Sequence, residues 1–263
     1  MTNEFYVGYL PKAPTALAEF LRRIVVVLGL AVVIMALLLV VAQRPFANSS
    51  FEYRKVRSFE GVVEARPFPT LLIARPGEIG QNDKYSRYLL VAPGKHGADD
   101  MVDAVDGKQV RLQGQLIYRD GTTMVEIMPG SMAVIDNAPA VQATTRDLGT
   151  VMVTGEIVDS KCYLGVMNPG SGKVHRDCAA RCLSGGIPPL FVTADGREQF
   201  LLVGPDGRAL GHDALREFIA EPLTISAELL QRGENRLLRV DTQSLRHQPD
   251  GLQATRRSLE PGK

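Results

Sequence analysis

The segment YLLVAPG at residues 88–94 has a second version later in the chain, FLLVGPD at residues 200–206. After each segment the sequence predicts one short helix, over residues 99–105 in the first case and residues 213–219 in the second. Two further strand-like segments follow each helix. The same order of elements twice in one chain indicates an internal duplication.

The segments after the two helices have the alternation of half-buried strands. Apolar and polar side chains alternate over residues 110–116 and again over residues 223–229. Period two with one polar face is typical of a strand that covers a core on one side. Glycine-containing hairpin turns follow at residues 120–121 and 233–235 and lead into a last strand in each copy.

Each copy also opens with a strand that begins at a glycine, Gly61 in the first and Gly155 in the second. Three strands, a short helix and two closing strands is the order found in OB-type barrels, in which closure removes exposed sheet edges. The sequence therefore predicts a mainly β fold with two tandem small antiparallel OB-like β-barrels, each with one short helix. The alternative is one larger β-sandwich whose halves share strand patterns.

The expected module boundaries follow from composition. We place the first OB-like module at residues 50–135 and the second at residues 149–248. The linker is assigned to residues 136–148 because this segment is small, polar and proline-bearing, without hydrophobic periodicity. The polar and basic tail, residues 249–263, is expected to be flexible.

Ahead of the two modules lies an uninterrupted apolar run of nineteen residues, Ile24 to Ala42. At about 1.5 Å of rise per residue, a helix of that length crosses a hydrocarbon core of roughly 30 Å. We predict a single transmembrane helix over residues 24–43, preceded by a short tail and interfacial lead-in, residues 1–23. A cleaved signal peptide is the alternative, but its apolar region is shorter and ends in a small-x-small site.

Orientation rests on few charges. Arg22 and Arg23 directly precede the span, and long domains cross a membrane largely regardless of their own charge. We therefore expect a single-pass protein of a bacterial inner membrane with the short tail inside and the body in the periplasm. The formal net charge is +1 and no basic block follows the span, so nucleic-acid binding is not indicated.

All three cysteines of the chain lie in one insertion after the first strand of the second module, residues 159–189. A helix predicted from Cys178 to Gly185 places Cys178 and Cys182 on one face, because residues four apart share a face. We expect basic side chains of the same segment to surround these thiols and favour the thiolate, the form that binds metals and attacks disulfides; they are Lys173, His175, Arg176 and Arg181.

Three interpretations of this cluster remain open. In the first, Cys162, His175, Cys178 and Cys182 bind one zinc or copper ion, since three thiolates and an imidazole form a tetrahedral zinc set and soft sulfur also selects copper(I). In the second, Cys162 forms a disulfide with Cys178 or Cys182 and leaves one thiol over. In the third, the cysteines are small apolar side chains of a packed loop. Asp159, at the end of the strand, is expected to cap the loop or to orient a ligand.

The pattern Gly155-x-x-x-Asp159-x-x-Cys162, followed by Cys178-Ala179 and Cys182, resembles small exported bacterial OB-like modules, most of them uncharacterised. The resemblance covers about residues 151–240. It implies an OB-like fold and export but no activity.

The sequence contains no nucleophile elbow, phosphate-binding loop or dinucleotide fingerprint, so nothing argues for an enzyme. We expect a membrane-anchored periplasmic accessory or assembly subunit of a redox system, with a protein partner in a membrane complex and a metal- or thiol-based site in the second barrel. The alternative is a non-catalytic membrane-tethered adaptor whose insertion is held by a structural disulfide.

Overall fold

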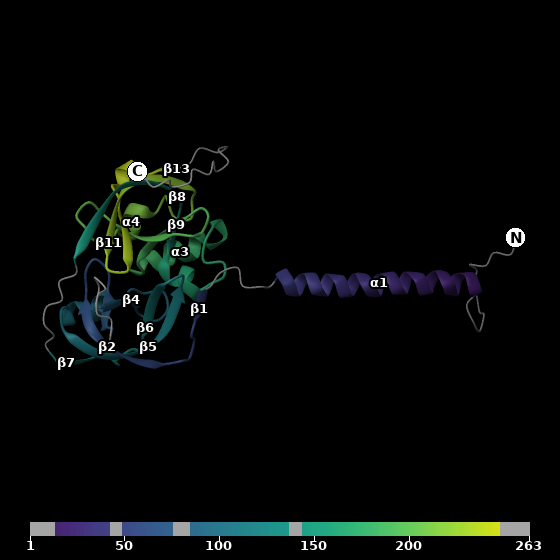
Figure 1. Ribbon diagram of the computed structural model, residues 1–263, viewed down its shortest axis with the longest axis horizontal. Coiled ribbons are helices and arrows are strands. Elements are labelled where there is room, and N and C mark those ends of the chain that lie inside the picture. The colour runs from purple at the N-terminus through teal and green to yellow at the C-terminus, as the bar shows by residue number, and fades with distance from the viewer. Residues whose placement is uncertain (1–13, 43–48, 76–84, 137–143, 248–263) are drawn as a thin grey trace. The chain divides into compact units, whose positions relative to one another are not determined.

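The structure is a computed structural model, and it describes residues 14–42, 49–75, 85–136 and 144–247 (Figure 1). The chain divides into two compact units, residues 1–48 and residues 49–263. The predicted flexible tail, most of the predicted linker and the first part of the lead-in lie outside the described residues.

The first unit contains one long helix, α1 (Thr15–Ala42). Over Thr15–Val41 it is long and apolar enough to cross a membrane, and none of its most apolar window is buried within the chain. The helix begins at Thr15, so the described part of the predicted lead-in is helical and continuous with the apolar run. An apolar helix with this length and no buried face suggests a single membrane span.

The first barrel is a closed sheet of five strands. β5 (Gln109–Arg119) is long enough to pair with both β2 (Arg57–Glu64) and β6 (Thr122–Ile127). A parallel pairing of β4 (Tyr85–Val91) with β6 completes the closure. Two short strands, β1 (Ser49–Phe51) and β7 (Ala133–Asp136), also pair with β5, both antiparallel to it. The short helix α2 (Asp99–Val102) and the turn η1 (Asp103–Val105) lie between β4 and β5 in the chain. The fifth strand, β3 (Thr70–Ala74), pairs with β2 and β4.

The second barrel repeats this plan. β11 (Leu223–Arg232) pairs with β8 (Thr145–Asp159) and β12 (Asn235–Arg239). A parallel pairing of β10 (Gln199–Val203) with β12 closes the sheet. The helix α4 (His212–Leu215) lies between β10 and β11, shorter than predicted, and β13 (Arg246–His247) pairs with β11 after the turn η4 (Thr242–Ser244). The fifth strand, β9 (Pro189–Thr193), pairs with β8 and β10. The predicted fold class is confirmed: an apolar N-terminal helix and two closed five-stranded barrels, each with a short helix, rather than one sandwich.

A glycine in the first strand of each barrel marks the same structural point. Gly61 pairs with Val110 and Gly155 with Leu223, where the first strand meets the strand that follows the helix. A Cβ on Gly155 would lie 1.9 Å from the carbonyl oxygen of Val192. Only glycine allows the backbone to approach the neighbouring strand this closely, and this accounts for the repeated glycine in the sequence.

Three hydrophobic clusters hold the body together. One fills the first barrel and one fills the second. The third combines side chains of both barrels, including Leu89 and Met124 of the first and Leu190 and Leu201 of the second, and it contains Cys162 and Cys182. The two barrels therefore share a core, and the cysteines lie at their junction.

Candidate metal centre at the junction of the barrels

The insertion between β8 and β9 supplies all three thiols. Its helical segments are the turn η2 (Cys162–Val166), the turn η3 (Lys173–His175) and the helix α3 (Arg176–Ser184). Cys162 begins η2, and α3 carries Cys178 and Cys182 one turn apart, as the spacing predicts. The helix starts two residues earlier than expected.

The three sulfur atoms converge. The Sγ atom of Cys162 lies 3.9 Å from that of Cys178 and 3.9 Å from that of Cys182, and all three lie within 4.8 Å of one another. Sulfurs about 2.3 Å from a central ion lie about 3.8 Å apart in a tetrahedral site and about 4.0 Å apart in a trigonal one. The observed separations fit a metal ion held by three thiolates, whereas a disulfide needs sulfurs about 2.05 Å apart.

Two of the thiols are sheltered and one is accessible. Cys162 is 4% exposed and Cys182 is 2% exposed, while Cys178 is only half-buried. The contact between Cys162 and Cys182 lowers the pKa of Cys182, against the effect of burial. The same contact, together with burial and the charge of Asp159, raises the pKa of Cys162. Of these two buried thiols, Cys182 is therefore the more acidic.

His175 belongs to a second group that shares Cys162 with the first. Its ring is 3% exposed, and its Nε2 atom lies 3.0 Å from Oδ2 of Asp159. Asp159, His175 and Cys162 form a group of potential ligand atoms within 4.8 Å of one another. The structure thus brings the three predicted sulfur ligands together and places the predicted imidazole beside them, bonded to a carboxylate. Metal binding by these four residues stays a prediction.

Asp159 organises this end of the insertion. Its side chain is fully buried, and its Oδ1 atom accepts a hydrogen bond of 2.8 Å from the backbone N–H of Cys162. The expected loop cap is therefore present. Because the other carboxylate oxygen bonds His175, one side chain fixes both the start of η2 and the orientation of the imidazole.

The expectation that basic residues of the insertion surround the thiols was largely wrong. Lys173 and Arg176 form ion pairs with Glu221 instead. The cation at the sulfurs is Lys95 of the first barrel, whose Nζ atom donates to the Sγ atom of Cys178 at 2.9 Å. This contact raises the pKa of Lys95. No local signal could have identified Lys95, because 83 positions separate the two residues.

A clamp between the barrels holds Lys95 in place. The Nζ atom of buried Lys161 donates to the carbonyl oxygens of Ala92 and Gly94, at 2.8 Å and 2.7 Å, and pairs with Glu126 of β6. All three donors of its ammonium group therefore have acceptors in the first barrel. The clamp fixes the loop that carries Lys95 against the start of η2.

The glycine pair after α3 completes this contact. Gly97 donates its backbone N–H to the carbonyl oxygen of Gly185 at 2.8 Å. A Cβ on Gly185 would lie 1.9 Å from the carbonyl oxygen of Lys95, and Gly186 adopts a φ of +90°. These glycines let the first barrel approach the end of the cysteine-bearing helix closely.

The other side of the insertion also rests on the first barrel. Arg119 of β5 donates to the carbonyl oxygen of Tyr163 at 3.1 Å, and its guanidinium lies 3.9 Å from the centre of the Tyr163 ring. A Cβ on Gly165 would lie 2.7 Å from the backbone of Ser50 in β1. The insertion is therefore held between the barrels rather than extended into solvent.

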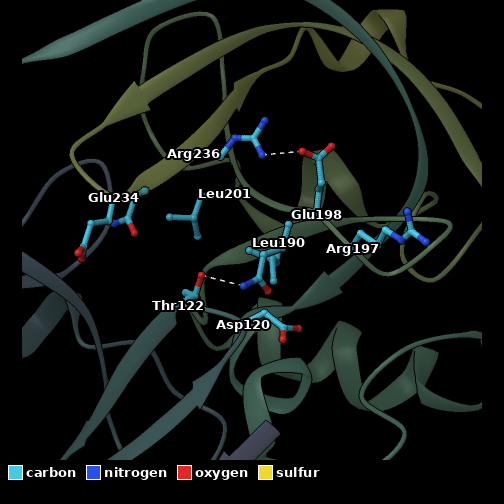
Figure 2. A pocket seen from close by; sticks show the side chains of 11 residues that line it. Asp120, Thr122, Leu190, Arg197, Glu198, Leu201, Glu234 and Arg236 are labelled. Carbon is cyan, nitrogen blue, oxygen red and sulfur yellow. Dashed lines mark hydrogen bonds and ion pairs between the residues drawn. The ribbon is translucent and has the colours of Figure 1, made fainter. Parts of the chain in front are cut away.

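A separate pocket lies between the hairpin of β5 and β6 and the strands β10 and β12 (Figure 2). Its charged side chains are engaged with protein partners: Arg236 pairs with Glu198 at 2.7 Å, and Glu234 pairs with Arg75. The amide of Gln199 donates to Thr122 at 2.8 Å across the junction. Among the residues that the structure describes, no cysteine or histidine lines this pocket, so it is distinct from the thiol cluster.

The chain matches no family model, no curated protein sequence and no solved structure. The resemblance to exported OB-like modules therefore stays a prediction, and the case for function rests on the geometry of the site.

Proposed function

We propose that this protein is a membrane-anchored metal-binding protein whose three cysteines hold one soft metal ion, zinc or copper(I). It would act in the periplasm, on a bacterial inner membrane, as an accessory or assembly subunit of a redox system. The observation that carries the proposal is the convergence of three sulfur atoms at separations of 3.9 Å, which suit a common ion.

The surroundings of the sulfurs support this proposal. Cys162 and Cys182 belong to the core shared by the barrels, so their positions are set by packing before any ion arrives. Cys178 is half-buried and provides a route by which an ion can enter or leave through ligand exchange. A site with two fixed ligands and one accessible ligand suits a protein that receives an ion and passes it to a partner.

The anchor supports the role of an accessory subunit. An apolar helix of 28 residues would keep the body at a membrane, where a partner complex would also be embedded. The barrels would supply a rigid frame for the site and a surface for the partner.

Metal content tests the proposal. The full-length chain in detergent, reduced and then loaded anaerobically with zinc or copper(I), should carry one ion per chain by elemental analysis after desalting. Cys178→Ser should lose the ion, and His212→Ala, a histidine outside the cluster, should keep it. A wild-type chain without stoichiometric metal, or a Cys178→Ser chain that binds as well as wild type, would overturn the proposal.

The adaptor alternative is supported by one feature of the same geometry. Cys162 is equally close to both other sulfurs, so rotation of one side chain would allow a disulfide with either. Thiol counting on protein isolated from membranes and denatured under acid separates the two functions. Three free thiols exclude the disulfide, whereas one free thiol per chain supports the adaptor.

A further inference from the structure

We infer that the ion is copper(I) and that Lys95, presented by the first barrel, selects it over zinc. This inference rests on the proposed function and narrows it to one ion. It depends on the contact of Lys95 in the first barrel with Cys178 in the second, which the spacing of the cysteines does not predict.

The ligand set is the first argument. Zinc in structural sites takes four ligands in a tetrahedron, so it would need one more donor beside the three thiolates. The nearest imidazole, His175, is bonded through its Nε2 atom to Asp159 at 3.0 Å, which leaves only its Nδ1 atom for an ion. Copper(I) is selected by soft thiolates and is satisfied by three of them, so the three converging sulfurs are a complete ligand set for it without a fourth donor.

The charge of the loaded site is the second argument. Three thiolates with zinc carry a net charge of about −1, and three thiolates with copper(I) carry about −2. Because Cys162 and Cys182 are almost fully buried, this charge is poorly screened. A fixed positive charge at the site therefore stabilises the copper(I) complex more than the zinc complex.

Lys95 supplies this charge from an exposed side chain on a loop that is held in place. Its ammonium lies 2.9 Å from the Cys178 sulfur, and the loop that carries it is fixed by Lys161 and by the contact of Gly97 with Gly185. Asp159, the other charged group at the sulfurs, has the opposite effect because its carboxylate repels an anionic complex. Lys95 offsets that repulsion from the accessible side, next to the half-buried thiol.

The ratio of the two affinities tests the inference. Copper(I) and zinc affinities of the full-length chain are measured anaerobically by competition with chromophoric chelators, for wild type, Lys95→Gln, Lys95→Arg and the control Lys173→Gln. Lys173 is an exposed lysine of the same insertion that pairs with Glu221. We expect the copper-to-zinc ratio to fall by roughly five- to tenfold in Lys95→Gln, and to stay near wild type in the other two variants.

The ratio is informative because both affinities come from one variant, so a general loss of stability cancels. A ratio unchanged in Lys95→Gln, or reduced equally in Lys173→Gln, would overturn the inference while leaving the metal site intact. A wild-type chain that binds neither ion would instead overturn the proposed function.

Discussion

The two barrels share a strand order and a closing parallel pair, yet only one of them carries the thiol cluster. Between its first and second strands the first barrel has a short connection, residues 65–69, whereas the second barrel has residues 160–188 at the same place. The difference shows that a duplicated barrel provides a frame on which one loop can be expanded without disturbing closure. The candidate site of this chain lies on that expanded loop and on the residues that contact it.

The first barrel nevertheless contributes to the site through a loop that both copies have. An isolated bridge joins Val91 to Gly97 in the first barrel and Val203 to Ala209 in the second, so Lys95 holds the place that Gly207 holds in the second copy. One copy thus uses the loop as a plain glycine turn, and the other uses it to place a cation on a thiol.

Breaking the clamp between the barrels should have the largest effect on stability. Lys161→Met leaves the buried carboxylate of Glu126 without its partner, and removing one member of a buried pair costs about 3–5 kcal/mol of unfolding free energy. Urea denaturation measures the loss, and the control is Lys108→Met, a half-buried lysine whose Nζ atom donates to the carbonyl oxygen of Ala104 in the first barrel. The double variant Lys161→Met/Glu126→Gln should regain part of the loss; strictly additive losses would argue against the clamp.

The close approach of the barrels at the glycine pair should give a smaller effect. Gly185→Ala forces a methyl group onto the carbonyl oxygen of Lys95, and we expect a loss of about 1–3 kcal/mol in the same denaturation measurement. Gly211→Ala, which has open space around its Cβ position, should change stability little. Equal losses in both variants would mean that the contact between the barrels is not the cause.

His175 decides whether the second group contains a metal ligand or an orienting pair. If the histidine acts through Asp159 on Cys162, His175→Ala should retain one ion per chain and lower the affinity by about 10–100-fold, as outer partners of metal ligands do. Competition titration measures the affinity and elemental analysis the stoichiometry. Complete loss of the ion, with binding intact in His212→Ala, would identify His175 as a ligand.

The smallest expected effect is a difference in thiol reactivity. In the metal-free reduced chain, iodoacetamide should modify Cys178 about tenfold faster than Cys162 or Cys182, because only Cys178 is accessible and it lies beside a cation. Peptide mapping by mass spectrometry at short reaction times measures the order. Bound metal should protect all three thiols, and protection of Cys178 alone would speak against a shared ion.

Much of the fold follows from local patterns that need no partner. The apolar run from Ile24 predicts the long apolar helix, period-two alternation predicts the strands, and the repeated glycines mark where the first strand of each barrel approaches its neighbour closely. The four-residue spacing of Cys178 and Cys182 predicts their common helix face. These features depend on neighbouring residues, so the sequence by itself determined the two barrels, the apolar helix and the position of the insertion.

Only the tertiary structure decided how the barrels meet and what that contact does to the sulfurs. The contact of Lys95 with Cys178, the clamp of Lys161 and the pairing of His175 with Asp159 join residues that are distant in the chain. The sequence contains the cationic side chains and the thiols, but it does not predict which of them are in contact. The choice comes from packing two barrels around one shared core, because the lowest free energy there depends on every side chain at the junction at once.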